Sequence, residues 1–147
     1  MKSNIEIYPR NDLNNILPAL KELLDTCYPN PPRDVFYRLI EQYRIGFPAY
    51  VAVEENEKVI GFTYLAPNSK GGTLESLAVH PDFRGLQIGS DLVQHLLDKN
   101  RGVIQITTRI PAFFEKLAFQ SITQLPDNSY FMIHLNFWYL NNDLENL

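Results

Sequence analysis

Residues 77–90 read Leu77-Ala78-Val79-His80-Pro81-Asp82-Phe83-Arg84-Gly85-Leu86-Gln87-Ile88-Gly89-Ser90, and this stretch decides the fold. The pattern predicts a strand ending near Val79, a short loop, and a helix starting near Ile88. Gly85 and Gly89 lack a Cβ, so a ligand can approach the backbone closely there. The first N–H groups of a helix have no partner within it and lie at its positive end. The stretch therefore predicts a site for phosphate or pyrophosphate, with the Arg84 cation at its mouth.

Outward from this stretch, the hydrophobic pattern predicts an alternation of strands and helices. Consecutive strands precede a helix–strand crossover, which favours a mixed-sheet α+β domain over a doubly wound parallel sheet. Pro18 lies within the first helical pattern and is expected to kink or divide it. The expected strands are 5–8, 49–54, 58–66, 73–79, 103–107 and 130–135; the expected helices are 11–24, 35–43, 88–99 and 112–117, with a turn over 67–72.

Composition excludes several classes of protein. The 147 residues are 45% hydrophobic and 20% charged, which is typical of one globular domain over residues 1–147. A single cysteine, Cys27, excludes an intrachain disulfide and a cysteine-based zinc cluster, and we expect no metal. The start has no apolar signal-peptide core, and no apolar run reaches membrane-spanning length, so we expect a cytoplasmic protein with no membrane partner. A net charge of −4 argues against nucleic-acid binding.

Two motifs resemble the GNAT superfamily of acetyl-CoA-dependent N-acetyltransferases. That family has V-x-P followed by R-G-x-G-x-G or R-G-x-Q-x-G, and residues 79–81 and 84–89 match the second form. Residues 113–119 are similar to its F/Y-x-K-x-G-F segment. Two departures stand out: Gln87 occupies a position where many relatives have glycine, and Ala118 replaces the glycine of the G-F pair. The resemblance covers nearly the whole chain.

The resemblance implies a fold and a cofactor site. The fold is an α+β GNAT-like domain whose mostly antiparallel sheet splays between strands 73–79 and 103–107 and is flanked by helices. Acetyl-CoA is the implied co-substrate, with its pantetheine on the strand and its pyrophosphate on the following amides. Phe113 and Phe114 are interpreted as core and cofactor-contacting residues. The implied cofactor residues are Leu77, Ala78, Val79, Arg84, Gly85, Leu86, Gln87, Ile88, Gly89, Ser90, Phe113 and Phe114.

Acetyl transfer to an amine requires a base, oxyanion donors and a proton for the departing thiolate. Glu75 is the first candidate base, because alternation would place it with Thr73, Leu77 and Val79 on one face of the strand. Similar enzymes have a glutamate there, often acting through water. The alternative is a carboxylate that only attracts a cationic substrate. His80 is interpreted as a solvated loop residue, and His134 as structural or surface-exposed.

The residues leave several candidates for the group that protonates the thiolate. Many relatives have a tyrosine at the position of Phe114, and phenylalanine cannot donate a proton. The thiolate leaves unaided, or water donates the proton, or Tyr130 or Tyr139 does. We take Tyr130 as the candidate acid.

The acceptor is predicted to be a small-molecule amine, with an amino acid as one option. Residues 106–114 resemble the T-T-R…F-F-E-K-L-G-F segment of N-acetylglutamate synthase-like GNAT enzymes, and Arg109 could clamp an acceptor carboxylate. Arg109 is otherwise a surface charge or a contact on the CoA side. The aromatic tail over 137–140 packs on the domain, walls the acceptor pocket or forms a homodimer seam. Two further hypotheses remain: a CoA-binding module without catalysis, and a protein acetyltransferase acting on lysine or an N-terminus.

Overall fold

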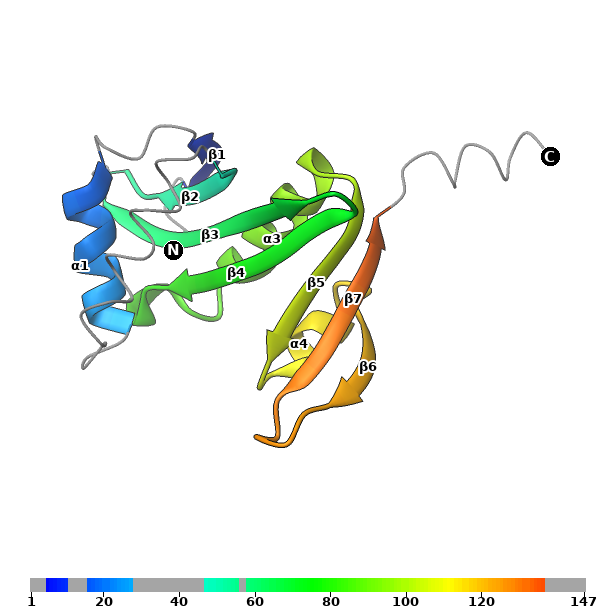
Figure 1. Cartoon of the computed structure of the whole chain (residues 1–147). Coiled ribbons are helices and arrows are strands. Elements are labelled where there is room, and N and C mark those ends of the chain that lie inside the picture. The colour runs from blue at the N-terminus through cyan, green and yellow to red at the C-terminus, as the bar shows by residue number, and fades with distance from the viewer. Residues whose placement is uncertain (1–4, 11–15, 28–46, 56–57, 137–147) are drawn as a thin grey trace.

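The computed structural model describes residues 5–10, 16–27, 47–55 and 58–136. The predicted helix over 35–43, the start of the first predicted helix, Tyr139 and the aromatic tail over 137–140 lie outside these ranges. The elements follow one another along the chain as Figure 1 shows. They are β1 (Glu6–Arg10), α1 (Leu17–Cys27), β2 (Ala49–Val53), β3 (Val59–Asn68), β4 (Gly71–Val79), the 3₁₀ turn η2 (Pro81–Phe83), α3 (Ile88–Lys99), β5 (Gly102–Thr108), α4 (Pro111–Glu115), β6 (Gln120–Gln124) and β7 (Tyr130–Asn136).

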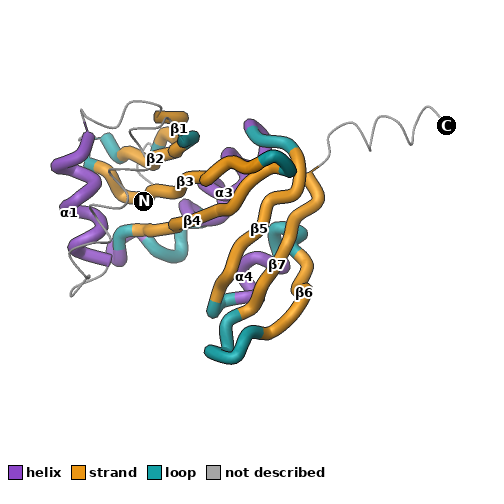
Figure 2. Tube along the Cα trace, in the orientation of Figure 1, coloured by secondary structure: helices purple, strands orange, loops and turns teal. Residues whose placement is uncertain are grey.

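The described strands form one seven-stranded sheet in the order β1-β2-β3-β4-β5-β7-β6. Every neighbouring pair is antiparallel except β4 and β5, which are parallel. These two strands pair only at their starts, where Gly71–Thr73 meets Val103–Gln105. Beyond that point they diverge, and the gap between them is visible in Figures 1 and 2. The expectation of a mixed, mostly antiparallel sheet splayed between these two strands is confirmed.

Two glycines allow the strands to meet at the apex of the gap. Gly71 and Gly102 have φ angles of 152° and 112°, which side chains disfavour. A Cβ on Gly102 would clash with the Lys70 carbonyl, and one on Gly71 would clash with the Val103 backbone. The close approach of β4 and β5 therefore requires glycine at both positions.

The sheet has a hydrophobic core on each face. On one face, here called the α3-side core, Leu92 and Leu96 of α3 pack with Ile60, Ile104 and other buried residues of the sheet. On the other face, the α1-side core, three leucines of α1 pack against buried residues of β2 and β3; these leucines are Leu20, Leu23 and Leu24. The two helices thus clamp the sheet from opposite sides and hold β4 in place between them.

Pro18 lies at the start of α1 and does not break the helix that follows it, while residues 11–15 of the predicted helical pattern lie outside the described residues. The helix begins at Leu17, so Pro18 lies in its first turn. The N–H that proline lacks would have no intrahelical partner at this position. The residue therefore marks the start of the helix and causes no break within the described part of α1.

A β-bulge at Glu75 overturns the predicted alternation along β4. Leu74 pairs with Leu65 of β3 and Ser76 pairs with the preceding Tyr64, so Glu75 is an extra residue without a cross-strand partner. Leu74 consequently packs in the α3-side core, where Leu77 and Val79 also make contact. Thr73 lies on the opposite face, with its hydroxyl accepting a hydrogen bond from Gln105 at 2.9 Å. Strict period-two counting cannot anticipate this shift.

One further strand and one turn also differ from expectation. Strand β6 was not predicted, because all five of its residues are exposed and it has no buried face to reveal it. The turn expected over 67–72 is shorter: β3 extends to Asn68 and β4 begins at Gly71. The Asn68 side chain accepts hydrogen bonds from the N–H groups of Lys70 and Gly71, which tightens this turn. Within the described ranges, no helix has the length and apolar character needed to span a membrane.

Candidate functional site

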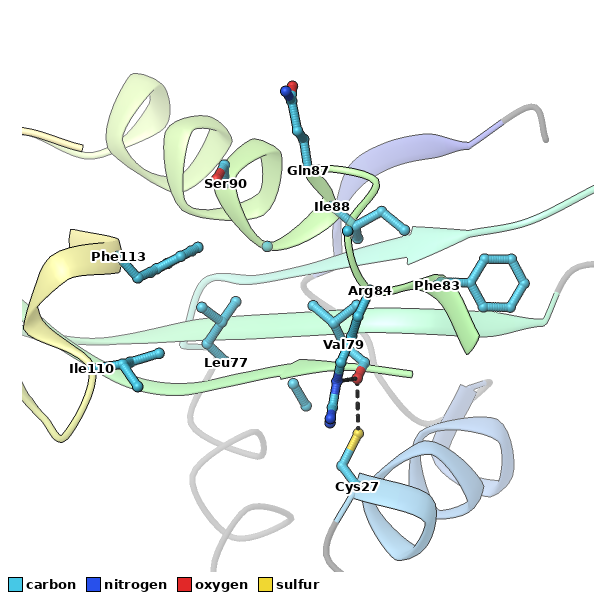
Figure 3. A pocket seen from close by; sticks show the side chains of 13 residues that line it. Cys27, Leu77, Val79, Phe83, Arg84, Gln87, Ile88, Ser90, Ile110 and Phe113 are labelled. Atoms are coloured by element: carbon cyan, nitrogen blue, oxygen red, sulfur yellow. Dashed lines mark hydrogen bonds between the residues drawn. The ribbon is translucent and has the colours of Figure 1, made fainter. Parts of the chain in front are cut away.

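A cavity of about 480 Å³ lies where β4 ends and α3 begins. Figure 3 shows its wall built from several elements that are far apart in the sequence. Among the described residues, Leu77, Ala78 and Val79 come from β4, the 83–90 segment contributes every residue except Leu86, and Cys27, Ile110 and Phe113 complete the lining. The volume falls within the range of about 300–1,000 Å³ typical of ligand sites.

The start of α3 presents backbone N–H groups to this cavity. The Asp91 N–H donates to the Gln87 carbonyl at 2.9 Å, which is the first turn of helical bonding. The amides of Ile88, Gly89 and Ser90 precede that bond and have no backbone acceptor among the described residues. They lie at the positive end of a 12-residue helix, beside the exposed Arg84. This arrangement suits a pyrophosphate group.

Gly89 is the point at which three elements meet. A Cβ there would contact Phe113 Cζ of α4 at 3.4 Å and Val79 Cγ2 of β4 at 3.6 Å. A methyl group would just fit, and anything larger would enter the cavity. The absence of a side chain leaves the amides of the helix start accessible, so the residues present fit the pyrophosphate of acetyl-CoA.

The edge of β4 that faces the gap has no strand partner among the described residues along the cavity. The His80 N–H donates to the Ile60 carbonyl of β3 at 2.8 Å, so the backbone groups of Ala78 also point to β3 by alternation. Those of Leu77 and Val79 point the other way, toward the gap, where β5 no longer pairs. They can serve an extended ligand that carries amides, such as pantetheine, and the Leu77 and Val79 N–H groups can act as oxyanion donors.

The Val79 carbonyl is already engaged on this edge. Arg84 Nε donates to it at 3.2 Å and Cys27 Sγ donates at 3.3 Å, as the dashed lines in Figure 3 show. Burial raises the pKa of the Cys27 thiol, and the nearby Arg84 charge opposes this only in part. The thiol is therefore neutral near pH 7, and it serves as a hydrogen-bond donor on the wall.

The predicted acid–base and acceptor residues do not line the cavity. Glu75 is exposed at the bulge of β4. Tyr130 is half-buried at the start of β7, opposite Thr108 of β5. Arg109 lies in the β5–α4 connection with 72% of its side chain exposed, and its guanidinium is 3.5 Å from the Asp127 carboxylate. Hydrogen bonds from Ser129 lower the pKa of Asp127, which keeps this partner of Arg109 charged.

The two phenylalanines of α4 have different places. Phe113 lines the cavity, whereas Phe114 is 2% exposed in the α3-side core and is absent from the lining. The three rings of Phe113, Phe114 and Phe119 form successive edge-to-face contacts, at centroid distances of 4.9 and 5.4 Å. Phe114 thus supports the wall from behind. Leu86 likewise packs against the α3-side core instead of lining the cavity.

Of the described residues that line the cavity, three were missed by the sequence reasoning. Cys27 ends α1, and no local pattern connects it with β4, 52 residues away. Ile110 precedes Pro111 in a connection, where an apolar residue has no periodic signal. Phe83 lies inside the quoted stretch, two residues after Pro81, and its place beside Arg84 could have been inferred.

Both departures from the family pattern lie at unusual backbone angles. Gln87 has a φ of 65° and Ala118 a φ of 70°, in the left-handed region. Glycine adopts this region without strain, so the backbone at both positions favours glycine. Gln87 immediately precedes the free amides of α3, and Figure 3 shows its side chain directed away from Arg84 and Val79.

The known proteins to which the chain is similar are acetyltransferases. Residues 17–119 match the sequence model of the Acetyltransferase (GNAT) family. Peptidyl-lysine N-acetyltransferase YjaB of Salmonella typhimurium is 30% identical over 106 residues, which cover 69% of this chain and 68% of that protein. GNAT family N-acetyltransferase YhbS from Escherichia coli, solved with CoA, aligns with a TM-score of 0.77 and 18% identity over 92% of this chain and 83% of that one. The ribosomal-protein-S18-alanine N-acetyltransferase of Escherichia coli aligns with a TM-score of 0.72 and 17% identity, over 87% and 92% of the two chains.

Proposed function

Because the chain belongs to the GNAT family of acetyltransferases and acts with acetyl-CoA, we propose that it moves the acetyl group directly to a primary amine of a small molecule. The amine nitrogen, once deprotonated, attacks the thioester carbonyl. The tetrahedral oxyanion then collapses, the C–S bond breaks, and the CoA thiolate takes up a proton. An amino acid is the first acceptor to test.

One observation carries this proposal: the open edge of β4 and the free amides of the α3 start share one cavity. In our proposal, the amides from Gly85 to Ser90 and the Arg84 side chain hold the pyrophosphate, and the backbone of Leu77 and Val79 pairs with pantetheine. A chain that binds in this way runs along β4 toward the bulge. The thioester then lies on the side of Glu75, away from the charged end of the cavity.

We assign the base role to Glu75. The bulge places its carboxylate outside the cross-strand register, and the side chain is exposed to water. A carboxylate in that position can take the amine proton through an intervening water molecule. We assign the acid role to Tyr130, whose hydroxyl-bearing ring packs at the edge of the α3-side core near the end of β5.

Arg109 is our candidate for an acceptor carboxylate. Its guanidinium already contacts the Asp127 carboxylate across the loops that follow β5 and β6. An amino-acid acceptor would have to replace Asp127 on Arg109 or share the guanidinium with it. An amino acid is therefore expected to gain more from Arg109 than an amine without a carboxylate.

A second candidate function is acetylation of lysine side chains in proteins. It is favoured by the 30% identity to the relative described as a peptidyl-lysine N-acetyltransferase. A third, a CoA-binding module without catalysis, is motivated by Phe114, which places a buried phenyl ring where many relatives have a tyrosine.

The experiment is a thiol-release assay with acetyl-CoA and a panel of acceptors. The panel holds amino acids, alkyl amines without a carboxylate, and a lysine peptide. We expect the highest kcat/KM for a small amine. A rate confined to the lysine peptide would instead support the second candidate. Binding of acetyl-CoA by calorimetry, with no release for any acceptor, would support the third.

The matched variants for this assay lie on α3. Gly89→Glu places bulk and negative charge where the pyrophosphate is proposed, and should weaken acetyl-CoA binding by orders of magnitude. Gln94→Glu adds the same charge at an exposed position of α3 outside the cavity lining and should bind normally. Equal affinities of the two folded variants would refute the pyrophosphate assignment.

A further inference from the structure

His80 is buried at the end of β4, with only 9% of its surface exposed. The sequence suggested a solvated loop residue, and the structure corrects this. Its Nδ1 accepts a hydrogen bond from the Asp82 N–H at 3.1 Å. Its ring stands edge-to-face against Phe83 at a centroid distance of 5.7 Å. The side chain thus makes both a polar contact and an apolar contact with the turn that follows it.

That turn, η2, connects β4 to residues 84–90, which line the cavity apart from Leu86 and are here called the cavity segment. The His80 carbonyl accepts from the Phe83 N–H at 2.9 Å, and its own N–H is bonded to β3. Arg84 follows and folds back so that its Nε donates to Val79. The conformation of η2 therefore decides where Arg84 and the next amides lie relative to β4.

Without the imidazole, the Asp82 N–H would have no acceptor among the residues that the structure describes. It belongs to the first turn of a three-residue helix, where amides have no internal partner. A nitrogen that accepts a hydrogen bond carries no proton, so the ring N–H is on Nε2. An asparagine side chain can offer an acceptor to the N–H two residues further on in the same way.

We propose that His80 is a positioning residue for acetyl-CoA, acting through the Nδ1 bond that fixes η2. This inference rests on the proposed acetyl-CoA site. His80 is absent from the cavity lining, so its effect reaches the ligand only through the placement of Arg84 and the following amides. The neighbouring Asp82 carboxylate, 3.9 Å from Nδ1 and 82% exposed, takes no part in this bond, which uses the backbone of that residue.

Two substitutions separate the hydrogen bond from the packing of the ring. His80→Asn keeps an acceptor and loses the ring, whereas His80→Phe keeps a ring against Phe83 and loses the acceptor. Asp82→Asn is the control, because it keeps the backbone N–H. The measurements are acetyl-CoA affinity by calorimetry, thermal unfolding, and kcat and KM for acetyl-CoA with the best acceptor of the panel.

We expect His80→Phe to weaken acetyl-CoA binding about tenfold or more and to raise KM, with kcat at saturating acetyl-CoA nearly unchanged. His80→Asn and Asp82→Asn should stay within about threefold of the parent. The reverse order, with His80→Phe binding normally and His80→Asn weakened, would overturn the proposal, as would equal affinity of all variants. If His80→Phe does not fold, His80→Asn still distinguishes the two roles. A packing role of the ring requires His80→Asn to lose affinity for acetyl-CoA, whereas the hydrogen-bond role requires it to keep that affinity.

A different variant tests the proposed acetyl-CoA site itself, independently of the role of His80. Should Gly89→Glu bind acetyl-CoA as tightly as the parent, the site itself is wrong, whatever the His80 variants do. If Gly89→Glu loses affinity for acetyl-CoA as expected while His80→Phe keeps it, only the role of His80 is refuted.

Discussion

The Sγ of Cys27 donates a hydrogen bond to the backbone oxygen of Val79 at 3.3 Å, joining the end of α1 to the end of β4 on the cavity wall. The two residues are 52 positions apart. Because the Val79 oxygen also accepts from Arg84 Nε, one carbonyl ties together α1, β4 and the cavity segment. Any ligand in the cavity lies against this junction.

Acetyl-CoA should protect Cys27 from alkylation. The raised pKa of the thiol makes iodoacetamide react slowly, and a ligand in the cavity would cover the sulfur further. The sequence has one cysteine, so the intact mass reports this site alone. We expect at least a several-fold slower rate at saturating acetyl-CoA, and equal rates in urea, where the chain is unfolded. An unchanged rate in the folded protein would place the ligand elsewhere.

Glu75→Gln should lower kcat, because the amide cannot take up the amine proton. General bases contribute roughly 10²–10⁴-fold. The remaining activity should rise with pH as more of the acceptor amine deprotonates in solution. Glu115→Gln, which changes an exposed glutamate of α4, is the control. A decrease of less than about threefold at pH 7 would leave Glu75 only a role in attracting substrate.

Tyr130→Phe should lower kcat about tenfold or more if this hydroxyl protonates the thiolate. Tyr50→Phe removes a hydroxyl on β2, which accepts a hydrogen bond from Asn100 outside the cavity, and should leave kcat unchanged. Phe114→Tyr should not raise kcat appreciably, since it places a hydroxyl in the α3-side core at a cost of about 1–3 kcal/mol of stability. Full activity of Tyr130→Phe would mean that the thiolate leaves unaided or that water or Tyr139 protonates it.

Ala118→Gly should stabilise the protein. A non-glycine residue at a φ of 70° costs roughly 1–2 kcal/mol, and glycine regains this at an entropic cost of about 0.5–1 kcal/mol. The free energy of unfolding from urea titration should rise by up to about 1.5 kcal/mol. Ala112→Gly, at an exposed helical position of α4, should lower it by a similar amount. Two changes of the same sign would contradict the backbone argument.

The free energy of unfolding should decrease as the pH falls, and His134 should account for part of this decrease. Burial lowers the pKa of this imidazole below its ordinary value of 6.5, so the unfolded chain binds the proton more readily. The contribution of the neutral His134 ring to stability is complete above pH 6.5 and is lost as the pH falls below that value. His134→Phe keeps a ring against Phe119, at a centroid distance of 5.2 Å in the parent, and should lose less stability between pH 7.5 and 5.5. Parallel pH profiles of the two proteins would exclude this role.

Local chemistry in the sequence determined much of the fold and predicted one end of the candidate site. The glycines and Arg84 between the strand and the helix predict an anion-binding turn, because free amides and missing side chains are local properties. Hydrophobic periodicity located most described elements, whereas the divergence of β4 and β5 was implied by the family resemblance. The unusual backbone at Ala118 was also accessible, as a departure from a glycine position.

Only the tertiary structure decided how side chains from separate elements meet. The bulge at Glu75 arises from the register with β3, and it moved Leu74 to the face that counting assigned to Thr73. Cys27 reached the cavity because α1 packs across β4, and the burial of His80 follows from its place between β3 and η2. Phe113 and Phe114 are adjacent and chemically identical, yet one lines the cavity and the other fills the core. Such assignments depend on contacts between residues distant in the chain, which a local pattern does not encode.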